Sequence, residues 1–345
     1  MLSLKIKKQL ENRTVLITGG TGSLGNELVK IFLKKFSLKR LVIFSRDELK
    51  QSEMMKRYSS LDKKEILRFF LGDVRDLSRM KFAMRDIDYV IHAAALKHVD
   101  MAEYNPLEYI NTNINGAKNV IEAAFSCNVE KVVALSTDKA ANPINLYGAT
   151  KLASDKLFVS ANNISGNQKT RFAVVRYGNV ANSRGSVLPY FLKLNQINSK
   201  NFPITDKRMT RFWITLSQSA ELVLNSFYQM RGGEIFVPKI PSVRILDIAK
   251  AVSVNKHIKY IGIRPGEKIS EILCSRDDSS NTIEFKSYYS LKPSIKFIDQ
   301  KINYLVNKDK EKGKYVSSNF EYSSSNNKKF LTVDQIKKYI KNEFN

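Results

Sequence analysis

Cysteine and long apolar runs are scarce in this sequence of 345 residues, and each scarcity excludes a class of protein. Two cysteines, Cys127 and Cys274, are too few for a disulfide framework, and no CxxC pair indicates zinc, so we expect no structural metal. No apolar run approaches the roughly 18 residues that a membrane span needs. Residues 1–13 lack the apolar stretch and cleavage site of a signal peptide. These absences predict a soluble, cytoplasmic chain without membrane insertion.

Acidic residues are also few, since 33 Asp and Glu stand against 57 Lys and Arg and leave a formal net charge of +24. Such a surplus can attract nucleic acid, an anionic membrane surface or anionic small molecules. Lysine is scattered through the whole chain, and no RNP motif, helix-turn-helix or aromatic-basic stripe accompanies it. We interpret the charge as a solvated lysine-rich surface and expect no nucleic-acid partner.

The first half of the chain alternates short apolar strands with helical patterns. Continuous apolar segments predict strands at 14–18, 41–44, 66–71, 89–91, 132–135 and 172–175. Apolar residues at helical spacing predict helices at 24–36, 116–125 and 151–162. Buried strands that alternate with helices are typical of a parallel sheet covered on both faces. The expected fold class is therefore α/β, with a doubly wound parallel sheet of the Rossmann type.

After about Arg176 this rhythm breaks, and loops rich in glycine, proline and asparagine appear. Helices are predicted at 218–230, 245–252 and 332–340, and strands at 234–237 and 258–263. We expect residues 1–176 to form a dinucleotide-binding domain that also carries the catalytic motif. Residues 177–345 are expected to form mainly a smaller C-terminal substrate lobe, interleaved with the last strands of the sheet.

A glycine-rich turn directly follows the first predicted strand and opens the first predicted helix. Gly19, Gly22 and Gly25 are spaced as GxxGxxG, which allows a tight turn, close approach of a pyrophosphate and close helix–strand packing. The helix N-terminus adds N–H donors and a positive dipole. The turn therefore predicts dinucleotide binding by Gly19, Thr21, Gly22, Ser23, Leu24 and Gly25.

The end of the second predicted strand discriminates between the two nicotinamide cofactors. Arg46 and Lys50, about one helical turn apart, suit the 2′-phosphate of NADP, and Ser45 adds a hydroxyl. Asp47 instead suits the ribose 2′-hydroxyl of NAD, so NAD stays open. We favour NADP. The remaining cofactor contacts are expected from Gln51, Asp73, Val74, Ala93 and Ala95.

A second motif carries the chemistry. Tyr147 and Lys151 form YxxxK, whose helical spacing places both side chains on one face, where an ammonium group stabilises a phenolate base. After a Rossmann turn and a strand that ends at Thr137, this motif indicates a short-chain dehydrogenase/reductase arrangement. A dehydrogenase does not need the next two residues, Asp138 and Lys139. A carboxyl and an amine beside a ketone suit an elimination, which needs an acid and a base.

At these residues the sequence resembles the UDP-N-acetylglucosamine 4,6-dehydratases, which are extended short-chain dehydrogenases. The signature is residues 136–151 (STDKAANPINLYGATK), and similarity runs from about Asn12 to Ile340. Other similar stretches are 45–54, 91–99, 175–180, 183–187, 209–215, 233–241, 261–268 and 320–324. The match is nearest to the C5-inverting members, because membrane-bound retaining relatives often carry methionine at the place of Tyr147. Two departures are Asp100 in place of a proline and Asn182 in place of a glycine. Because asparagine tolerates left-handed backbone, we expect the turn at Asn182 to survive.

The resemblance implies a redox-neutral route and a set of residue roles. Tyr147 takes the sugar 4-hydroxyl proton while NADP+ accepts hydride, Lys139 removes the C5 proton, and Asp138 protonates the departing 6-hydroxyl. Thr137 holds the substrate hydroxyl and Lys151 supports Tyr147. By the same resemblance, UDP-N-acetylglucosamine is bound by Lys97, Thr137, Asn179, Val180, Arg211, Arg264 and Glu267, although Arg211 and Trp213 remain open between a gate and a core role. The resemblance also implies a homo-oligomer and a pseudaminic acid-type pathway that serves flagellin glycosylation.

Other functions remain open. A C5-retaining dehydratase stays open, because the sequence alone does not fix that stereochemistry. A UDP-sugar 4-epimerase of the same superfamily would share the glycine turn and YxxxK without needing Asp138 and Lys139. A non-catalytic, basic NADP-binding scaffold would bind polyanions in a salt-sensitive way without turnover.

Overall fold

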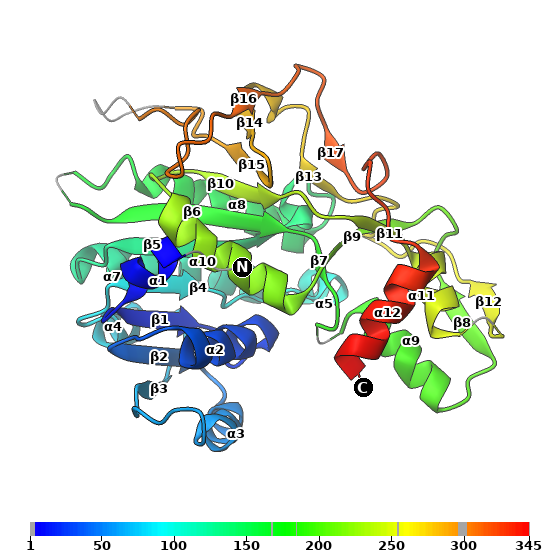
Figure 1. Cartoon of the computed structure of the whole chain (residues 1–345), viewed down its shortest axis with the longest axis horizontal. Helices are drawn as coiled ribbons and strands as arrows, with labels where there is room; N and C mark the ends of the chain where they lie inside the picture. Colours follow the sequence, from blue (N-terminus) through cyan, green and yellow to red (C-terminus); the bar gives the residue numbers. More distant parts are fainter. Residues whose placement is uncertain (1–3, 167, 184, 254, 296–301, 345) are drawn as a thin grey trace.

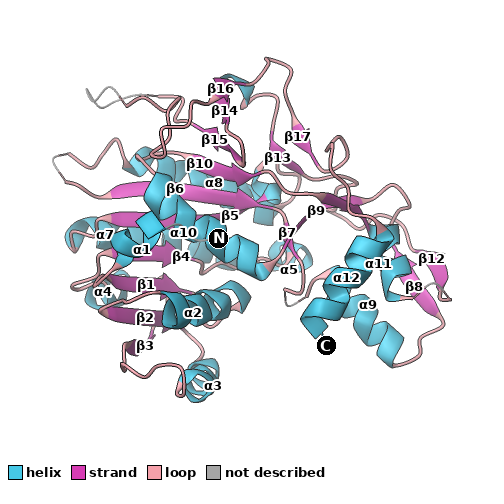
Figure 2. Ribbon diagram, in the orientation of Figure 1, coloured by secondary structure: helices cyan, strands magenta, loops and turns pink. Residues whose placement is uncertain are grey.

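A large central sheet carries the fold of the chain (Figure 1, Figure 2). The structure is a computed structural model that describes residues 4–344, apart from residues 167, 184, 254 and 296–301. Arg184, in one of the stretches similar to the dehydratases, lies outside the described residues. Within them the sheet has ten strands. In spatial order they are β16 (Lys314–Tyr315), β14 (Thr282–Glu284), β15 (Tyr288–Leu291), β10 (Ile235–Pro238), β6 (Arg171–Tyr177), β5 (Lys131–Thr137), β4 (Tyr89–His92), β1 (Thr14–Thr18), β2 (Arg40–Ser45) and β3 (Leu67–Leu71).

The strands from β3 to β10 are parallel, and β15, β14 and β16 extend the sheet antiparallel at one edge. The order β3-β2-β1-β4-β5-β6 is that of a doubly wound, dinucleotide-binding sheet. Every residue of β1 is buried, because a strand covered on both faces by helices has no solvent side. The predicted fold class is confirmed.

Helices cover both faces of this sheet, as Figure 1 shows. In front lie α1 (Leu4–Leu10), α2 (Ser23–Lys35) and α10 (Leu216–Gln229), and α10 packs against β5 and β6. Behind lie α4 (Leu77–Ala83), α7 (Gly116–Ser126) and α8 (Leu146–Ala161). The helix α3 (Glu48–Tyr58) packs beside β2. The helix α2 buries Leu28, Val29 and Phe32 in the core and exposes its three lysines to solvent, as an amphipathic helix does.

A smaller part of the chain forms its own hydrophobic cluster beside the sheet, at the right of Figure 1. Its helices are α9 (Val187–Gln196), α11 (Ile245–Val252) and α12 (Val333–Phe344). Its strands are β8 (Asn201–Ile204) paired with β12 (His257–Tyr260), and β7 (Asn179–Val180), β9 (Thr210–Ile214) and β11 (Ser242–Arg244) in a second small sheet. A short pair, β13 (Ile272–Cys274) with β17 (Tyr322–Ser323), packs its apolar residues onto the main core. The division of the chain near residue 176 stays a prediction.

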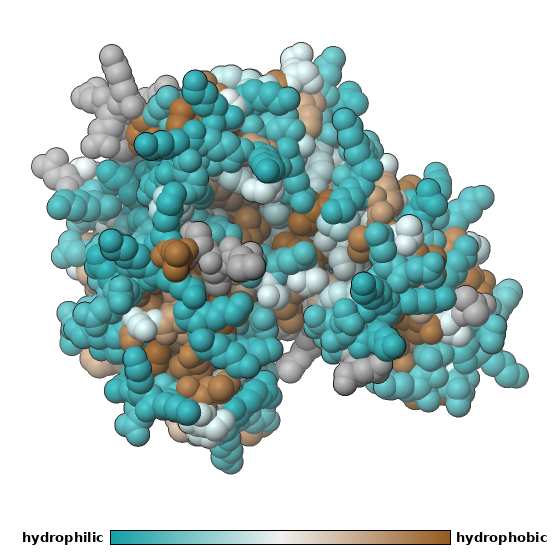
Figure 3. Space-filling view, in the orientation of Figure 1, coloured by the Kyte–Doolittle hydropathy of each residue, from teal (hydrophilic) through white to brown (hydrophobic). Residues whose placement is uncertain are grey.

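Three short elements complete the chain between β4 and α7: α5 (Val99–Tyr104), α6 (Pro106–Tyr109) and a π-helical turn at Ile110–Asn115. Single 3₁₀ turns occur at Asp138–Ala140 and Ser279–Asn281. The view in Figure 3 is mostly hydrophilic and is hollowed between the sheet and the smaller part. Asn182 has a φ of 62°, so the expected left-handed turn is confirmed.

Candidate active site

The carboxyl ends of the parallel strands meet at one edge of the sheet, and a cavity of about 1150 Å³ lies there. The strand β1 leads into Gly19, β2 ends at Ser45, and β5 ends at Thr137. Ligands of doubly wound sheets bind at this edge, where the strand order reverses between β1 and β4. Every site residue predicted from the sequence lines the cavity, with the exception of Gln51.

The glycine turn between β1 and α2 is shaped for a diphosphate. Gly19 has a φ of +64°, and a Cβ at this position would lie 2.8 Å from the Ala94 backbone. A Cβ at Gly25 would lie 2.1 Å from the Gly20 carbonyl oxygen, so only glycine lets α2 start so close to the turn. Gly22 is the N-cap and offers no side-chain oxygen, which leaves the N–H groups of the first helical turn for an anion. These residues fit a dinucleotide.

Charged side chains gather where the adenosine ribose of such a cofactor would bind. Asp47 caps α3 by accepting the Lys50 backbone N–H at 2.9 Å, and it also pairs with the Lys50 ammonium. Arg46 lies at the cavity rim, 3.4 Å from Asp73. Gln51 is buried instead, and its amide donates to the Ser45 hydroxyl at 3.0 Å and to a β3 carbonyl. Gln51 therefore holds Ser45 in place from behind the cavity wall.

An acid, a base and a second carboxylate converge after β5. The Asp138 carboxyl is 1% exposed, and its Oδ1 accepts from the Thr137 hydroxyl at 2.9 Å. The Lys139 ammonium lies 3.2 Å from Asp138 Oδ1 and 3.0 Å from Glu271 Oε1. Asp138 Oδ2 and Glu271 Oε2 are both buried without a hydrogen-bond partner within the described residues. Each of these oxygens is therefore available to a ligand or a proton.

The electrostatics of this group favour different protonation states for its members. Burial raises the pKa of Asp138, so this carboxyl takes up a proton more readily than an exposed aspartate. Burial alone would lower the pKa of Lys139, but the Asp138 and Glu271 carboxylates outweigh it and hold that pKa above its ordinary value. The charges of Lys139 and Arg211 lower the pKa of Glu271 against the opposing effect of burial. The substrate-free site thus favours an ammonium beside an ionised Glu271 and a readily protonated Asp138.

The YxxxK pair lies on α8, which begins at Leu146 because the Asn145 side chain caps it by accepting the Gly148 N–H at 2.8 Å. This start is earlier than predicted and brings Tyr147 and Lys151 onto one helix. Burial raises the pKa of Tyr147 to about 12, and Lys139, rather than Lys151, is the charge that acts against it. Burial also lowers the pKa of Lys151. The phenol therefore holds its proton at neutral pH until further positive charge is near.

A buried polar network supports α8 from beneath. The Ser136 hydroxyl donates to Asp155 Oδ2 at 2.7 Å, and Arg176 lies 3.2 Å from the same oxygen. Asp155 follows Lys151 by one helical turn and acts to raise its pKa. Neither Asp155 nor Arg176 was singled out from the sequence as part of the site.

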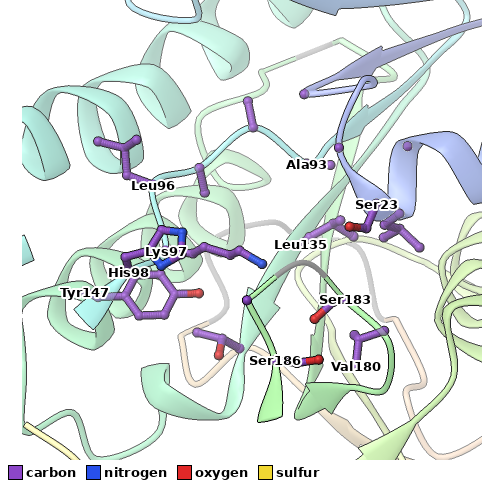
Figure 4. Close-up of a pocket in the computed structure, with 18 of the residues that line it drawn as sticks. Ser23, Ala93, Leu96, Lys97, His98, Leu135, Tyr147, Val180, Ser183 and Ser186 are labelled. Atoms are coloured by element: carbon purple, nitrogen blue, oxygen red, sulfur yellow. The ribbon is translucent and has the colours of Figure 1, made fainter. Parts of the chain in front are cut away.

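The opposite end of the cavity is polar and suits a nucleotide sugar. In Figure 4 the Lys97 side chain extends into the cavity beside the Tyr147 ring, and Ser183 and Ser186 lie next to one another in the turn after β7. Asn179 Oδ1 and Ser186 Oγ are buried without a hydrogen-bond partner within the described residues. Unsatisfied buried acceptors at a cavity wall indicate ligand contacts.

Arg211 is buried at this end of the site, where it lies near two carboxylates and two backbone carbonyls. Its guanidinium lies 3.7 Å from Glu267 and 3.8 Å from Glu271, and it also donates to the Thr210 and Ile269 carbonyls. Arg264 also lines the cavity, next to the Pro265-Gly266 turn. Trp213 packs against Tyr339 in the smaller hydrophobic cluster, so Trp213 belongs to the core.

Sequence reasoning missed Glu271, His98, Ser183 and Ser186 as lining residues. Glu271 had one available signal, because it is a lone carboxylate directly before an apolar strand, β13. The stretches around Lys97 and Ser183 that are similar to the dehydratases contain His98 and the two serines, but the similarity implies no role for them. The hydroxyl pair becomes visible only when the loop after β7 is folded over the cavity.

Two absences hold for the described residues. No group of three or more His, Cys, Asp or Glu side chains is placed to hold a metal ion there. Within the same residues, no helix has the length and apolar character required to cross a bilayer.

The fold and the cavity together are those of an enzyme of the short-chain dehydrogenase/reductase type. A family model described as "Polysaccharide biosynthesis protein" matches residues 15–293, and the chain belongs to this family. Sequence similarity is high to a protein of Campylobacter jejuni subsp. jejuni serotype O:23/36 named UDP-N-acetylglucosamine 4,6-dehydratase (inverting), with 56% identity over 94% of this chain and 96% of that one. The resemblance predicted from the sequence is thereby confirmed, and with it the dehydratase class.

The chain is also similar to proteins with other names. A protein of Rickettsia akari named UDP-glucose 4-epimerase is 41% identical over 95% of both chains. The solved structure of Pen from Bacillus thuringiensis superimposes with a TM-score of 0.85, at 34% identity over 97% of this chain and 98% of that one. The family therefore includes relatives with different named reactions, which the cavity itself has to distinguish.

Proposed function

We propose that this chain dehydrates UDP-N-acetylglucosamine across C4 and C6 with inversion at C5, giving UDP-2-acetamido-2,6-dideoxy-β-L-arabino-hexos-4-ulose. The observation that carries the proposal is the Asp138–Lys139–Glu271 cluster, which lines the same cavity as the dinucleotide turn and Tyr147. An oxidoreductase needs only the turn and the phenol, whereas loss of water also needs an acid and a base. The name of the Campylobacter relative supports the same reaction.

The glycine turn (Gly19, Gly22 and Gly25) would hold a dinucleotide, NADP in our proposal, which would supply a hydride acceptor for C4 and a hydride donor for C6, so that no net reduction occurs. Tyr147 first releases its own proton to solvent, which the positive charge of Lys139 favours, and the phenolate then takes the proton of the 4-hydroxyl. The resulting ketone acidifies the neighbouring C5–H bond. Lys139 removes that proton, Asp138 protonates the 6-hydroxyl, and one water leaves. A proton delivered to the opposite face of C5 then inverts this centre.

The 3.2 Å contact between Lys139 and Asp138 offers a way to prepare the base and the acid together. One proton that moves from Lys139 Nζ to Asp138 Oδ1 converts an ammonium–carboxylate pair into an amine and a carboxylic acid. Burial raises the pKa of Asp138 and favours that transfer, whereas the two carboxylates raise the pKa of Lys139 and oppose it in the substrate-free site. A single internal proton transfer thus supplies both groups that the elimination requires.

We propose NADP over NAD because of the charges at the rim. Arg46 keeps half of its side chain exposed at the cavity edge, where a phosphate can reach it. Asp47 is engaged by the α3 N-terminus and by Lys50, which leaves its carboxylate less suited to a ribose hydroxyl. Ser45, held by Gln51, supplies the hydroxyl.

The uridine diphosphate and the sugar are proposed to lie along the polar end of the cavity. Arg264 and Glu267 suit a phosphate and a ribose diol, respectively. Lys97, Thr137, Asn179, Val180 and Arg211 complete the lining, and all of them face the same cavity. We further propose, from family resemblance, a cytoplasmic homo-oligomer that opens a pseudaminic acid-type pathway and serves flagellin glycosylation.

A UDP-sugar 4-epimerase is the second candidate, because the Rickettsia relative carries that name at 41% identity. An epimerase interconverts hexoses without loss of water, so it has no use for a buried carboxyl with a raised pKa next to an ammonium group. A C5-retaining dehydratase differs only in the face from which C5 is reprotonated. A non-catalytic scaffold would leave Tyr147 and Lys139 without a purpose in the cavity.

Conversion of UDP-N-acetylglucosamine in deuterated water tests the proposal. We expect the product mass to reflect loss of one water, the NADP(H) balance to stay unchanged, and NMR to show deuterium at C5 with the inverted configuration. Unchanged substrate or a 4-epimer would exclude the dehydratase, and retained configuration at C5 would exclude the inverting form. Stoichiometric accumulation of NADPH would exclude a redox-neutral cycle.

A further inference from the structure

Glu271 is a buried carboxylate at the wall of the reaction cavity, and the mechanism above gives it no role. Its side chain is 1% exposed. Oε1 lies 3.0 Å from the Lys139 ammonium and 3.8 Å from Arg211 Nε, while Oε2 has no hydrogen-bond partner within the described residues. A carboxylate withdrawn from water this completely is costly unless a cation faces it. Lys139 is the nearest such cation.

The backbone of Glu271 is fixed independently of its side chain. The Glu271 N–H donates to the Ser324 hydroxyl at 2.9 Å, and the Ser324 N–H donates to the Glu271 carbonyl at 2.8 Å. The Ser324 hydroxyl also contacts the Thr210 hydroxyl at 2.8 Å. The C-terminal segment around β17 therefore holds Glu271 against the catalytic turn after β5, and a change of side chain leaves these bonds intact.

The charges that face Lys139 come from several elements. Asp138 comes from its own turn, Glu271 from the start of β13, and Arg211 from β9, whose positive charge opposes the ammonium. Tyr147 on α8 feels the charge of Lys139, and Lys268 lies close enough to interact with both carboxylates. Two carboxylates thus contact the ammonium directly, and Asp138 is the one that must become an acid during the proposed reaction.

We propose that Glu271 is a positioning residue, whose carboxylate is the permanent counter-ion that fixes Lys139 Nζ at the cavity wall and keeps the amine protonated in the substrate-free protein. This role rests on the proposed function only in so far as Lys139 acts there as a base. The two carboxylates then have different roles, because Asp138 exchanges a proton with Lys139 while Glu271 stays ionised. The raised pKa of Asp138 and the lowered pKa of Glu271 agree with this division.

Acetylation of lysines by acetic anhydride, followed by mass spectrometry, tests the protonation of Lys139 without any sugar or cofactor. Only the neutral amine reacts, so a fall of one unit in pKa raises the rate about tenfold at a fixed pH below that pKa. We expect Glu271→Gln to raise the acetylation rate of Lys139 about tenfold or more at pH 8, relative to Lys97 in the same cavity. The Lys97 rate corrects for any change in access of the reagent.

Two further variants keep this test decisive. Glu284→Gln is the matched control, because Glu284 lies on β14 and pairs with Lys239 and Lys314 away from the cavity, and the Lys139 rate should stay unchanged. Glu271→Asp keeps the charge, so its Lys139 rate should stay within about threefold of wild type. An equal Lys139 rate in wild type and Glu271→Gln would overturn the proposal. Should Glu271→Gln not fold, a tenfold rise in Glu271→Asp would overturn it.

Activity gives a second, separable readout. With UDP-N-acetylglucosamine in deuterated water, the rising limb of the pH profile for C5 deuteration should move to lower pH in Glu271→Gln, because less base is needed to neutralise Lys139. If wild type leaves the sugar unchanged but the acetylation rates of Lys139 still differ between wild type and Glu271→Gln, the proposed function is excluded and the counter-ion role of Glu271 is supported. If wild type turns the sugar over normally but Lys139 is acetylated equally fast in wild type and Glu271→Gln, only the counter-ion role of Glu271 is excluded.

Discussion

The guanidinium of Arg176 lies 3.2 Å from the carboxylate of Asp155, and both side chains are almost completely buried. The Arg176 guanidinium also donates a hydrogen bond to the Leu273 carbonyl in β13 at 3.2 Å. Asp155 belongs to the helix of Tyr147 and Lys151, and Leu273 follows Glu271 by two residues. This one ion pair therefore joins the helix of the phenol to the strand of the Lys139 counter-ion.

Breaking that pair should destabilise the whole protein. Asp155→Asn removes the nearer counter-charge of the buried guanidinium and leaves only Asp278, at 3.8 Å. Loss of one partner of a buried pair costs up to about 3–5 kcal/mol. Urea unfolding measures the change. Glu122→Gln is the control, because its pair with Lys81 is well exposed and contributes about 0.2–1 kcal/mol. Equal, small effects of the two variants would show that the Arg176 charge is compensated elsewhere.

Gly25→Ala should abolish dinucleotide binding. The new Cβ would lie 2.1 Å from the Gly20 carbonyl oxygen, so α2 has to move away from the turn that holds the diphosphate. We expect the dissociation constant for NADPH, followed by its fluorescence, to rise at least about tenfold. Gly166→Ala adds a Cβ with nothing within 4 Å, so it brings only backbone strain and should leave NADPH binding unchanged. Tight NADPH binding by Gly25→Ala would show that the cofactor lies elsewhere.

Arg46→Ala should weaken NADP binding selectively. A charge-assisted bond to a phosphate contributes about 1.5–3 kcal/mol, which corresponds to roughly 10- to 150-fold in the dissociation constant. The constants for NADPH and NADH, measured in parallel, separate the two cofactors, since NADH lacks the 2′-phosphate. A wild-type preference for NADH, or equal losses for both cofactors, would favour NAD.

The first half of the fold was predictable because its strands are short apolar runs separated by helical patterns. The strands around Val15 and Val133 were expected within two residues of their observed bounds, and the glycine turn was located from spacing alone. Local sequence determines these elements, since a strand buried on both faces has to be apolar throughout. The segment from Val99 to Asn115 carries no such pattern, and its two short helices and π-helical turn were not predicted.

The candidate site was predictable where function imposes a motif and was missed where distant segments meet. Asp138, Lys139 and Tyr147 lie within one stretch of sequence, so their proximity follows from local structure. Glu271 reaches them only because β13 pairs with β17, a contact between residues about fifty positions apart. Gln51 shows the converse, since it was expected to contact the cofactor, whereas its amide is buried and donates to the backbone of β2 and β3. Nothing in the local sequence distinguishes these two uses.

His92 should make stability depend on pH in a defined window. Burial lowers the pKa of this histidine to about 3, against about 6.5 when unfolded, and its Nδ1 lies 2.8 Å from the Thr18 hydroxyl. Below pH 6.5 His92 binds a proton in the unfolded chain but stays neutral in the folded protein. The contribution of neutral His92 to the free energy of unfolding is therefore fully present above pH 6.5 and is lost as pH falls toward 3. Between pH 6.5 and 5 we expect a loss of about 2 kcal/mol in urea unfolding.

His92→Asn provides the comparison for that window. An asparagine can still bond to Thr18 but does not ionise, so the loss between pH 6.5 and 5 should largely disappear. The variant is itself expected to be less stable at pH 7, because it removes a ring that packs against Phe158. Only the slope with pH tests the prediction, and an unchanged slope would assign the pH dependence to other groups.

Lys139→Ala should separate oxidation at C4 from elimination. The variant retains the glycine turn and Tyr147, so cofactor binding is expected to remain, while loss of a positioned base typically costs about 10²- to 10⁴-fold in rate. In single turnover, reduced nicotinamide should accumulate in proportion to enzyme, with no loss of water from the sugar. Lys81→Ala removes a surface ammonium that pairs with Glu122 and should leave turnover unchanged.

Without the Lys139 ammonium, Asp138 and Glu271 face one another and share a proton, so one of them has to become neutral. Full product formation by Lys139→Ala would therefore transfer the role of base from Lys139 to one of these two carboxylates.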